Sequence, residues 1–272
     1  MSGAAAVRGM ALYASVLVVL FPAVFVFFWM ITSALKQPVD IFAMPPRWLD
    51  FTVTFDNFRK AIADTPLLRY GYNSFVVAMA SSLTGLVLGL PAAYSIARFQ
   101  QHRLGLVLLT ARLMPGVAYL VPFFVLFVTL RLVGTHWALI LSHLVVTFPL
   151  TVYLMIGFFE DLPHELYDSA EIDGCGPFDV FWRIALPLSM PGVITASVLA
   201  FIFSWNDFKM ALILSDSDTR TLPVAVYSFI NEASLQWGPM MAYATLVALP
   251  VLLLTLFLQR YIISGLTAGS LK

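Results

Sequence analysis

Long apolar runs separated by short polar segments follow one another along most of the chain. The runs fall at residues 10–33, 72–97, 104–132, 137–159, 191–214 and 240–261. Each has about 20 residues or more, which as a helix crosses a hydrocarbon core of about 30 Å. The pattern predicts an all-α, polytopic membrane protein with six transmembrane helices, arranged as a single transmembrane domain over residues 1–272.

The composition supports a membrane protein over a soluble one. Hydrophobic residues make up 60% of the chain and charged residues only 11%, whereas soluble domains carry about 25% charged residues. The net charge is zero, so no basic surface indicates a nucleic-acid partner. The single cysteine, Cys175, excludes an internal disulfide framework and a cysteine-based zinc cluster. We expect membrane lipid around the chain and no metal site.

The first apolar run begins like a signal peptide, because Arg8 precedes it. However, this run extends from Met10 to Ile31 and lacks a cleavage site made of small residues. A signal peptide has a shorter apolar core and such a site. We therefore expect the run to be retained as the first span.

An even number of spans places both termini on the same side of the membrane. Short loops on the cytoplasmic side carry an excess of lysine and arginine. The loops on the N-terminal side contain Arg8, Arg98, Arg103 and Arg260, and those opposite contain Arg131 and Arg220. The opposite side also carries Lys36, Arg59, Lys60 and Arg69, but in a longer loop that counts for less. This modest excess predicts that both termini, and with them the segment 160–190, lie in the cytoplasm.

The segment 160–190 is a polar stretch between the fourth and fifth runs, and its first half predicts an acidic helix. Pro163 fits the first helical turn, where its missing N–H costs nothing. Glu165, Asp168 and Glu171 follow at a spacing of three, so they share one face. Gly174 is suited to the left-handed conformation that ends a helix.

The second half of the segment predicts another short helix, beginning at Pro177. Phe178, Phe181, Trp182 and Ala185 have the spacing of one apolar helical face, and prolines at 187 and 191 end the helix. Two interpretations fit: the segment lies on lipid headgroups, or it binds a protein. Helices on anionic lipid usually carry lysines, so the acidic residues favour a protein partner.

A longer motif makes the second interpretation specific. The string from Asp168 to Gly174 reads DSAEIDG, and it is followed by Phe178, by Leu186-Pro187 and by Pro191-Gly192. This string resembles the EAA motif of binding-protein-dependent ABC importer permeases. It departs from that motif where Asp168 replaces a glutamate and Ser169 an alanine, which keeps charge and small size.

The resemblance extends over most of the chain and is weakest over residues 1–70. The strings Trp205-Asn206-Asp207 and Gly265–Gly269 are similar to those of the smaller permease subunits of maltose-type systems, in the carbohydrate-uptake branch. The resemblance implies the ABC type I importer permease fold. It also implies a multi-pass protein of the plasma (cytoplasmic) membrane, the cell inner membrane, of a prokaryote.

The same resemblance implies a function in sugar import. The helix at 165–174 would be a coupling helix that docks on a cytoplasmic ATPase subunit. The implied partners are a second homologous permease, two ATPase subunits, an extracytoplasmic solute-binding protein and a sugar substrate. The implied ATPase-coupling residues are Glu165, Asp168, Ser169, Ala170, Glu171, Asp173, Gly174 and Phe178.

Two further segments acquire roles from the resemblance. The tail 265–272 corresponds to one that reaches between ATPase subunits, and the loop 215–238 to one that probes the cleft of the binding protein. The chain has no phosphate-binding G-x-x-x-x-G-K-[ST] string. We therefore expect a non-enzymatic subunit that binds no cofactor, with ATP and Mg used by the partner ATPase.

Polar and aromatic residues within the runs are candidates for the translocation path. Charges at membrane depth are costly and usually face a cavity or a partner, and aromatic rings stack on sugars. The candidates are Arg112, Tyr119, Phe123, Tyr153, Trp205, Asn206 and Asp207. In the alternative interpretation, Asp207 and Lys209 pair to hold the fold, the rings pack between helices, and a neighbour satisfies His143.

Two other functions compete with the ABC permease. In an ion-coupled secondary transporter of a small polar solute, Asp207 or Arg112 would carry the coupling ion. An intramembrane hydrolase is disfavoured, because no G-x-S-x-G occurs and His164-Glu165 lacks a second histidine at zinc-protease spacing. For a permease, a disaccharide, an oligosaccharide, an amino sugar and a glycerol-phosphate derivative all fit the sequence.

Overall fold

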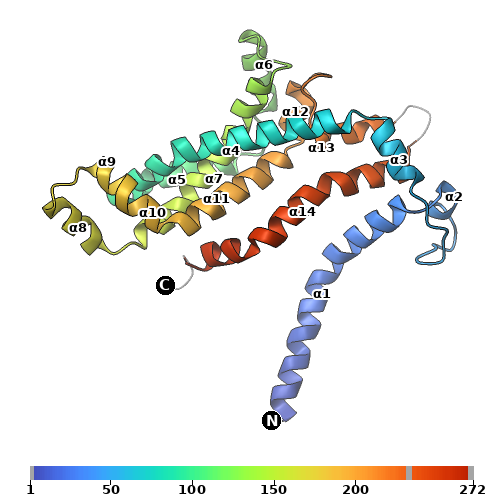
Figure 1. Ribbon diagram of the computed structural model, residues 1–272, viewed down its shortest axis with the longest axis horizontal. Coiled ribbons are helices and arrows are strands. Elements are labelled where there is room, and N and C mark those ends of the chain that lie inside the picture. The colour runs from blue at the N-terminus through green and yellow to red at the C-terminus, as the bar shows by residue number, and fades with distance from the viewer. Residues whose placement is uncertain (1–2, 231–234, 269–272) are drawn as a thin grey trace. The chain divides into compact units, whose positions relative to one another are not determined.

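Helices form every extended regular element of the described part of the chain (Figure 1). The computed structural model describes residues 3–230 and 235–268, and within these ranges all side chains except those of 3–9, 111–113, 171 and 260–268. Only one isolated antiparallel bridge, between Ile230 and Leu235, is present among the described residues. The all-α class predicted from the sequence is therefore confirmed.

The helices differ greatly in length. In chain order they are α1 (Gly3–Ala34), α2 (Pro38–Ile41), α3 (Asp56–Ala63), α4 (Leu67–Arg98), α5 (His102–Leu113), α6 (Leu120–Thr129), α7 (His136–Glu160), α8 (His164–Ile172), α9 (Pro177–Val180), the π-helix η1 (Phe181–Ala185), α10 (Leu186–Leu188), α11 (Met190–Trp205), α12 (Lys209–Leu214), α13 (Leu222–Ala225), the 3-10 helix η2 (Val226–Phe229) and α14 (Trp237–Ala268).

Four of these helices are long and apolar enough to cross a membrane: α1 from Met10, α4, α7 and α14 as far as Gln259. A further candidate is a bent pair, Pro177–Leu188 with Met190–Trp205, whose two parts meet at 79°. The bend falls at Ser189, between the two prolines that the sequence flagged. Counting the bent pair as one span gives up to five spans in the described residues.

The third apolar run differs from the single span expected over 104–132. It contains α5 with 12 residues and α6 with 10, and each is shorter than the roughly 20 residues that a span needs. The two helices are separated at 114–119, where Pro115 cannot donate the hydrogen bond that would continue α5. The count of six transmembrane helices therefore stays a prediction.

The chain divides into two compact units, and the single domain over 1–272 also stays a prediction. Unit 1 comprises Met1–Leu67 and Val226–Leu249, and unit 2 comprises Leu68–Ala225 and Pro250–Lys272. In unit 1, Asn57 Nδ2 on α3 donates to the carbonyl oxygens of Ala34 and Lys36, at 2.9 and 2.7 Å. This side chain holds α3 against the end of α1.

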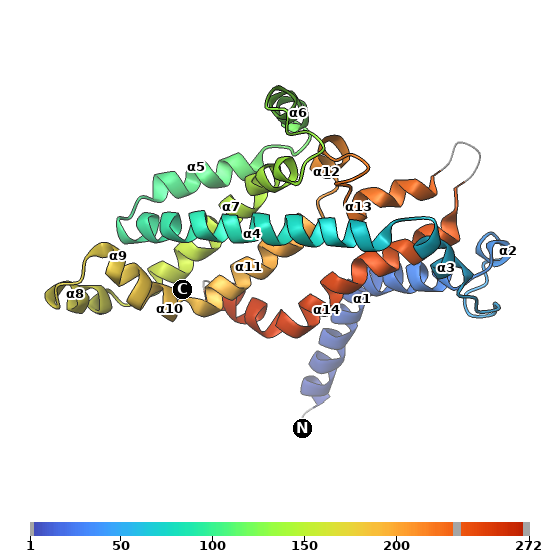
Figure 2. The ribbon, with the colours of Figure 1, turned by 45° about the horizontal axis from the view of Figure 1, so that its top comes forward.

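In unit 2, α4, α7 and α11 run side by side (Figure 1 and Figure 2). Small residues permit a close approach of α4 and α7: a Cβ atom added at Gly89 would lie 2.8 Å from Thr151 Cγ2. Small residues let helices approach in lipid, where packing drives their association. The residues Val152, Met155 and Ala196 lie in the core between α7 and α11, with 0% exposure each.

Candidate functional site

The helix α8 of segment 160–190 is fixed by one face to the end of unit 2. Tyr167 and Ala170, each 3% exposed, lie in the core with Tyr94 of α4, Phe159 of α7 and Phe181 of η1. The ring centroids of Tyr94 and Phe181 are 5.2 Å apart, and those of Tyr94 and Phe159 are 5.7 Å apart. This aromatic cluster connects α8 to the C-terminal ends of two long helices, α4 and α7.

Tyr167 is the polar centre of that contact. Its hydroxyl donates to the carbonyl oxygen of Phe159 at 3.3 Å, and the Arg98 guanidinium lies 4.9 Å from its ring centroid. Burial, assisted by nearby Tyr94, raises the pKa of Tyr167 to about 12, although Arg98 acts to lower it. The phenol therefore stays neutral at physiological pH and remains a hydrogen-bond donor.

The opposite face of α8 and the following turn are exposed. Five of the predicted coupling residues lie there, namely Glu165, Asp168, Ser169, Asp173 and Gly174, and Phe178 on α9 is 72% exposed. Ala170 instead packs inside unit 2, and the side chain of Glu171 lies outside the described residues. Ile172 was not singled out from the sequence, yet it is 86% exposed. Its spacing is the signal that could have found it: Ile172 is a large apolar residue on the same helical face as Glu165 and Asp168.

The turn after α8 depends on Gly174, as predicted. Its φ is +81°, in the left-handed region that side chains disfavour. The next N–H, of Cys175, donates to the carbonyl oxygen of Ala170 at 2.9 Å, which is the six-to-one bond of a Schellman cap. Pro177 then begins α9. The helix–glycine–helix layout read from the sequence is therefore confirmed.

The candidate path residues lie around two helix breaks within unit 2. Tyr119 ends the break between α5 and α6, and its ring centroid is 5.9 Å from that of Phe123. Asn206 and Asp207 lie in the break between α11 and α12. A Cβ added at Gly116 would collide with Lys209 Nζ and lie 3.3 Å from Tyr119 Oη. The two breaks therefore meet, with polar groups from each.

The remaining candidates differ in their exposure. Asn206 is exposed, and among the described residues its Nδ2 donates to one acceptor, the carbonyl oxygen of Ile202 in the last turns of α11, at 2.9 Å. Trp205 is 5% exposed and stacks on Phe201, with centroids 5.6 Å apart. Tyr153 on α7 is 53% exposed. The side chain of Arg112 lies outside the described residues.

Asp207 has contacts of a structural kind. Its Oδ1 accepts from the backbone N–H of Met210 at 2.9 Å, in the first turn of α12, and lies 3.6 Å from His143 Nε2. His143 Nδ1 is 2.7 Å from Ser204 Oγ, which is 2.8 Å from Ser81 Oγ. A neighbour therefore satisfies Nδ1 of His143, whereas its Nε2 has no hydrogen-bond partner among the described residues. The buried polar chain of Ser81, Ser204 and His143 links α4, α11 and α7.

The comparisons with known proteins agree on one family. A family model described as "Binding-protein-dependent transport system inner membrane component" matches residues 85–267. The chain is 35% identical to a probable ABC transporter permease protein of Sinorhizobium fredii, over 94% of this chain and 92% of the relative. It is 34% identical to the sulfoquinovosyl glycerol transport system permease of Agrobacterium fabrum, over 95% of this chain and 92% of the relative.

Other relatives and two solved structures agree. A diacetylchitobiose uptake system permease of Streptomyces coelicolor is 31% identical, over 92% of both chains. A bacterial ABC transporter involved in alginate import superimposes with a TM-score of 0.78 over 96% of this chain and 98% of the other, at 17% identity. The MetNI methionine ABC transporter gives 0.61 over 73% and 95%, at 18% identity. At such identities the two structures show a shared fold.

Proposed function

This chain belongs to the family of binding-protein-dependent transport system inner membrane components, and from that premise we propose that it carries a sugar or sugar derivative into the cell. It is a non-catalytic, multi-pass permease subunit in the plasma membrane, and it works with ATPase and binding-protein partners. Relatives at 31–35% identity named for sulfoquinovosyl glycerol and diacetylchitobiose support the substrate class.

The observation that carries the proposal is the two-sided construction of α8. One side is pinned by Tyr167 and Ala170, and the other presents Asp168, Asp173 and the apolar side chain of Ile172. Such a helix can transmit movement of a partner to the membrane helices. A partner bound to the outer face of α8 would move the ends of α4 and α7, because the aromatic cluster connects them to α8. We infer that this partner is a cytoplasmic ATPase dimer, which uses ATP and Mg.

The finer assembly belongs to the same proposal. A second homologous permease would complete the translocation path, and both termini would lie in the cytoplasm with α8. The path would pass the two helix breaks, where Tyr119, Lys209 and Asn206 offer hydrogen-bonding groups. Interrupted helices at membrane depth occur in transporters where the freed backbone lines a cavity.

The test is reconstitution of the chain with its partner permease, ATPase and binding protein in vesicles. We expect uptake of a labelled saccharide only with ATP and only with the binding protein present. A panel of a disaccharide, an N-acetylated disaccharide and a sugar–glycerol conjugate would then define the cargo. Uptake driven by an ion gradient in vesicles that lack the ATPase would contradict the proposal.

The docking face can be tested with Asp168→Lys and Ile172→Ser. We expect each substitution to lower ATP-driven uptake at least about fivefold, because a few central residues supply most of the binding energy of a protein interface. ATP hydrolysis should then proceed without transport. Leu49→Ser is the matched control, since Leu49 is an apolar residue 77% exposed in unit 1. Equal uptake by all three variants and the unmodified chain would contradict the proposal that this face of α8 docks on the ATPase.

The path can be tested with Asn206→Ala. We expect transport to fall about fivefold, the worth of about one hydrogen bond to substrate. Assembly should be unchanged, because the one side-chain hydrogen bond of Asn206 among the described residues goes to Ile202, four residues earlier. Trp205→Ala is the contrasting variant: it removes a buried ring and should reduce the amount of folded protein. If Asn206→Ala reduced assembly as much as Trp205→Ala, Asn206 would have a structural role instead.

A further inference from the structure

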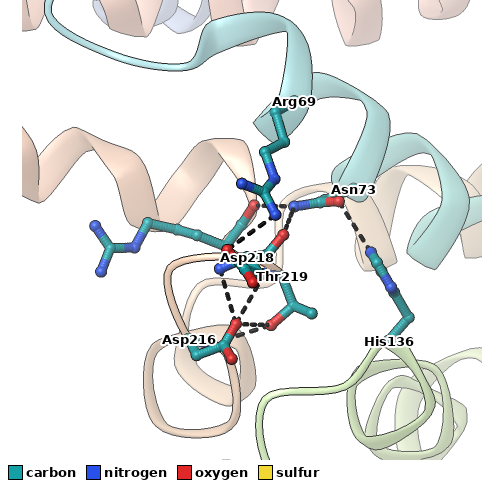
Figure 3. Close-up of polar contacts among 7 residues, drawn as sticks. Arg69, Asn73, His136, Asp216, Asp218 and Thr219 are labelled. Carbon is teal, nitrogen blue, oxygen red and sulfur yellow. Dashed lines mark hydrogen bonds and ion pairs between the residues drawn. The ribbon is translucent and has the colours of Figure 1, made fainter.

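The loop 215–221, which joins α12 to α13, is held by one buried side chain of α4 (Figure 3). Asn73 is 2% exposed, and its Nδ2 donates to the carbonyl oxygens of Asp218 and Arg220, each at 2.9 Å. Both hydrogens of one amide are therefore used to fix the backbone of a loop about 145 residues further along the chain.

His136 at the start of α7 sets the orientation of that amide. Its Nε2 lies 2.9 Å from Asn73 Oδ1 (Figure 3). Because Nδ2 faces two carbonyl oxygens, Oδ1 must be the atom that faces the histidine, and Oδ1 can only accept. The imidazole nitrogen Nε2 therefore carries a hydrogen, and the loop is tied to α4 and α7 together.

The loop also has an internal framework. Asp216 Oδ1 accepts from the N–H groups of Asp218 and Thr219 and from Thr219 Oγ1, each at 2.9 Å. Slight desolvation acts to raise the pKa of Asp216, but these hydrogen bonds outweigh it and lower the pKa. The carboxylate therefore stays charged down to pH values below its ordinary pKa, and the turn keeps its framework.

The surface ion pair at this loop contributes little by comparison. Arg69 Nη2 lies 2.9 Å from Asp218 Oδ1, but the two side chains are 52% and 67% exposed. Exposed ion pairs contribute little to stability, because water screens the two charges. The buried Asn73 amide therefore carries the attachment of the loop itself, and buried Ser74 Oγ accepts from the N–H of Leu222 at its end, at 2.8 Å. Asp216, Ser217 and Asp218 stay exposed at the tip. A loop whose backbone is fixed and whose tip is exposed is suited to recognition.

The location of the loop indicates its partner. The loop contacts α4 at Arg69 and Asn73, and Leu222 directly after it contacts Ser74. The helix α8 contacts α4 near Tyr94 and Arg98. These sites lie at opposite ends of a 32-residue helix, which is about 48 Å long at 1.5 Å per residue. If α8 faces the ATPase, as the proposed function holds, the loop faces the side where the binding protein arrives.

We propose that Asn73, oriented by His136, is a positioning residue that holds loop 215–221 in the shape that the solute-binding protein engages. This inference rests on the proposed function for the identity of the partner. We call the attachment of loop 215–221 by Asn73 the Asn73 clamp, and it rests only on the contacts of Asn73. The clamp and the engagement of the loop by the binding protein can be measured separately.

The clamp is tested by a nitroxide label at position 217. Ser217 is exposed, and with Cys175→Ala the Ser217→Cys variant of the whole chain has one cysteine. We expect Asn73→Ala to convert the label spectrum from restricted to mobile. Asn57→Ala is the matched control, because Asn57 also donates to two backbone carbonyl oxygens, but within unit 1. A label spectrum unchanged by Asn73→Ala would overturn the clamp.

The engagement is tested by the ATPase rate of the reconstituted transporter with and without the binding protein. Loss of two buried hydrogen bonds should cut the stimulated rate about tenfold, with a basal rate near that of the unmodified protein. His136→Ala, at a half-buried position, should act in the same direction if Asn73→Ala fails to assemble. His136→Gln keeps a donor and should restore most of the stimulation, and Arg69→Ala should change it little.

These outcomes separate the two claims. A mobile label with full stimulation would overturn engagement of the loop by the binding protein. A binding protein that fails to stimulate even the unmodified transporter would contradict the proposed function, while the label spectrum would still decide the clamp. An Arg69→Ala defect as large as that of Asn73→Ala would overturn the assignment to the amide and favour the ion pair.

Discussion

Replacing Gly174 by proline is expected to abolish ATP-driven uptake, at least about tenfold below the unmodified chain, while the protein still inserts into the membrane. Gly174 has a φ of +81°, and the proline ring fixes φ near −65°. The turn that joins α8 to α9 would have to change its path. The outer face of α8 would then change its orientation relative to Phe178 on α9. The measurement is ATP-driven uptake by the variant and by the unmodified chain.

A graded series at Gly174 separates backbone strain from steric conflict. A Cβ atom at this position would meet nothing within 4 Å, so the alanine variant reports backbone conformation without steric conflict. Alanine in the left-handed region costs about 1–2 kcal/mol, whereas asparagine tolerates that region better. We expect uptake to fall in the order glycine, asparagine, alanine, proline. Uptake by the proline variant equal to that of the unmodified chain would show that the turn has no role in coupling.

The properties of Gly174 could be predicted because they are local. A glycine that ends an acidic helix before a proline has few other roles, and the structure confirms the left-handed turn. The accessible residues of α8 could be predicted only in part. Ala170 belongs to the same motif as Asp168, yet it packs beneath Tyr167. Which face of an amphipathic helix is covered depends on partners such as Tyr94, far away in sequence.

The breaks in the apolar runs show the same limit. Pro115 indicated a kink, but the separation of α5 from α6 over 114–119 is longer than one proline requires. The close approach of Lys209 to Gly116 involves a second break about 90 residues away. Hydropathy registers only that both segments are apolar enough to lie in lipid. The meeting of the two breaks, and the Asn73 clamp, are tertiary features.

The close contact of α4 and α7 leads to the second large effect, this time on folding. A Cβ atom added at Gly85 would lie 3.0 Å from Thr147 Oγ1 and 3.3 Å from the backbone carbon of Thr147. Backbone atoms cannot move aside as a side-chain tip can, so a bulky residue must separate the helices. We therefore expect Gly85→Leu to prevent folding of unit 2, measured as the loss of monodisperse protein in detergent.

Gly89 and Gly157 provide the graded case and the control. At Gly89 the nearest atom is Thr151 Cγ2, at 2.8 Å, so Gly89→Ala should cost about 1–3 kcal/mol. Thr151→Ser removes that methyl group and keeps the hydroxyl, so the double variant should regain part of the loss. Gly157 in α7 has nothing within 4 Å of an added Cβ atom, so Gly157→Ala should be neutral or stabilising. Equal melting temperatures for the Gly89 and Gly157 variants would mean that α4 and α7 do not depend on this glycine for their approach.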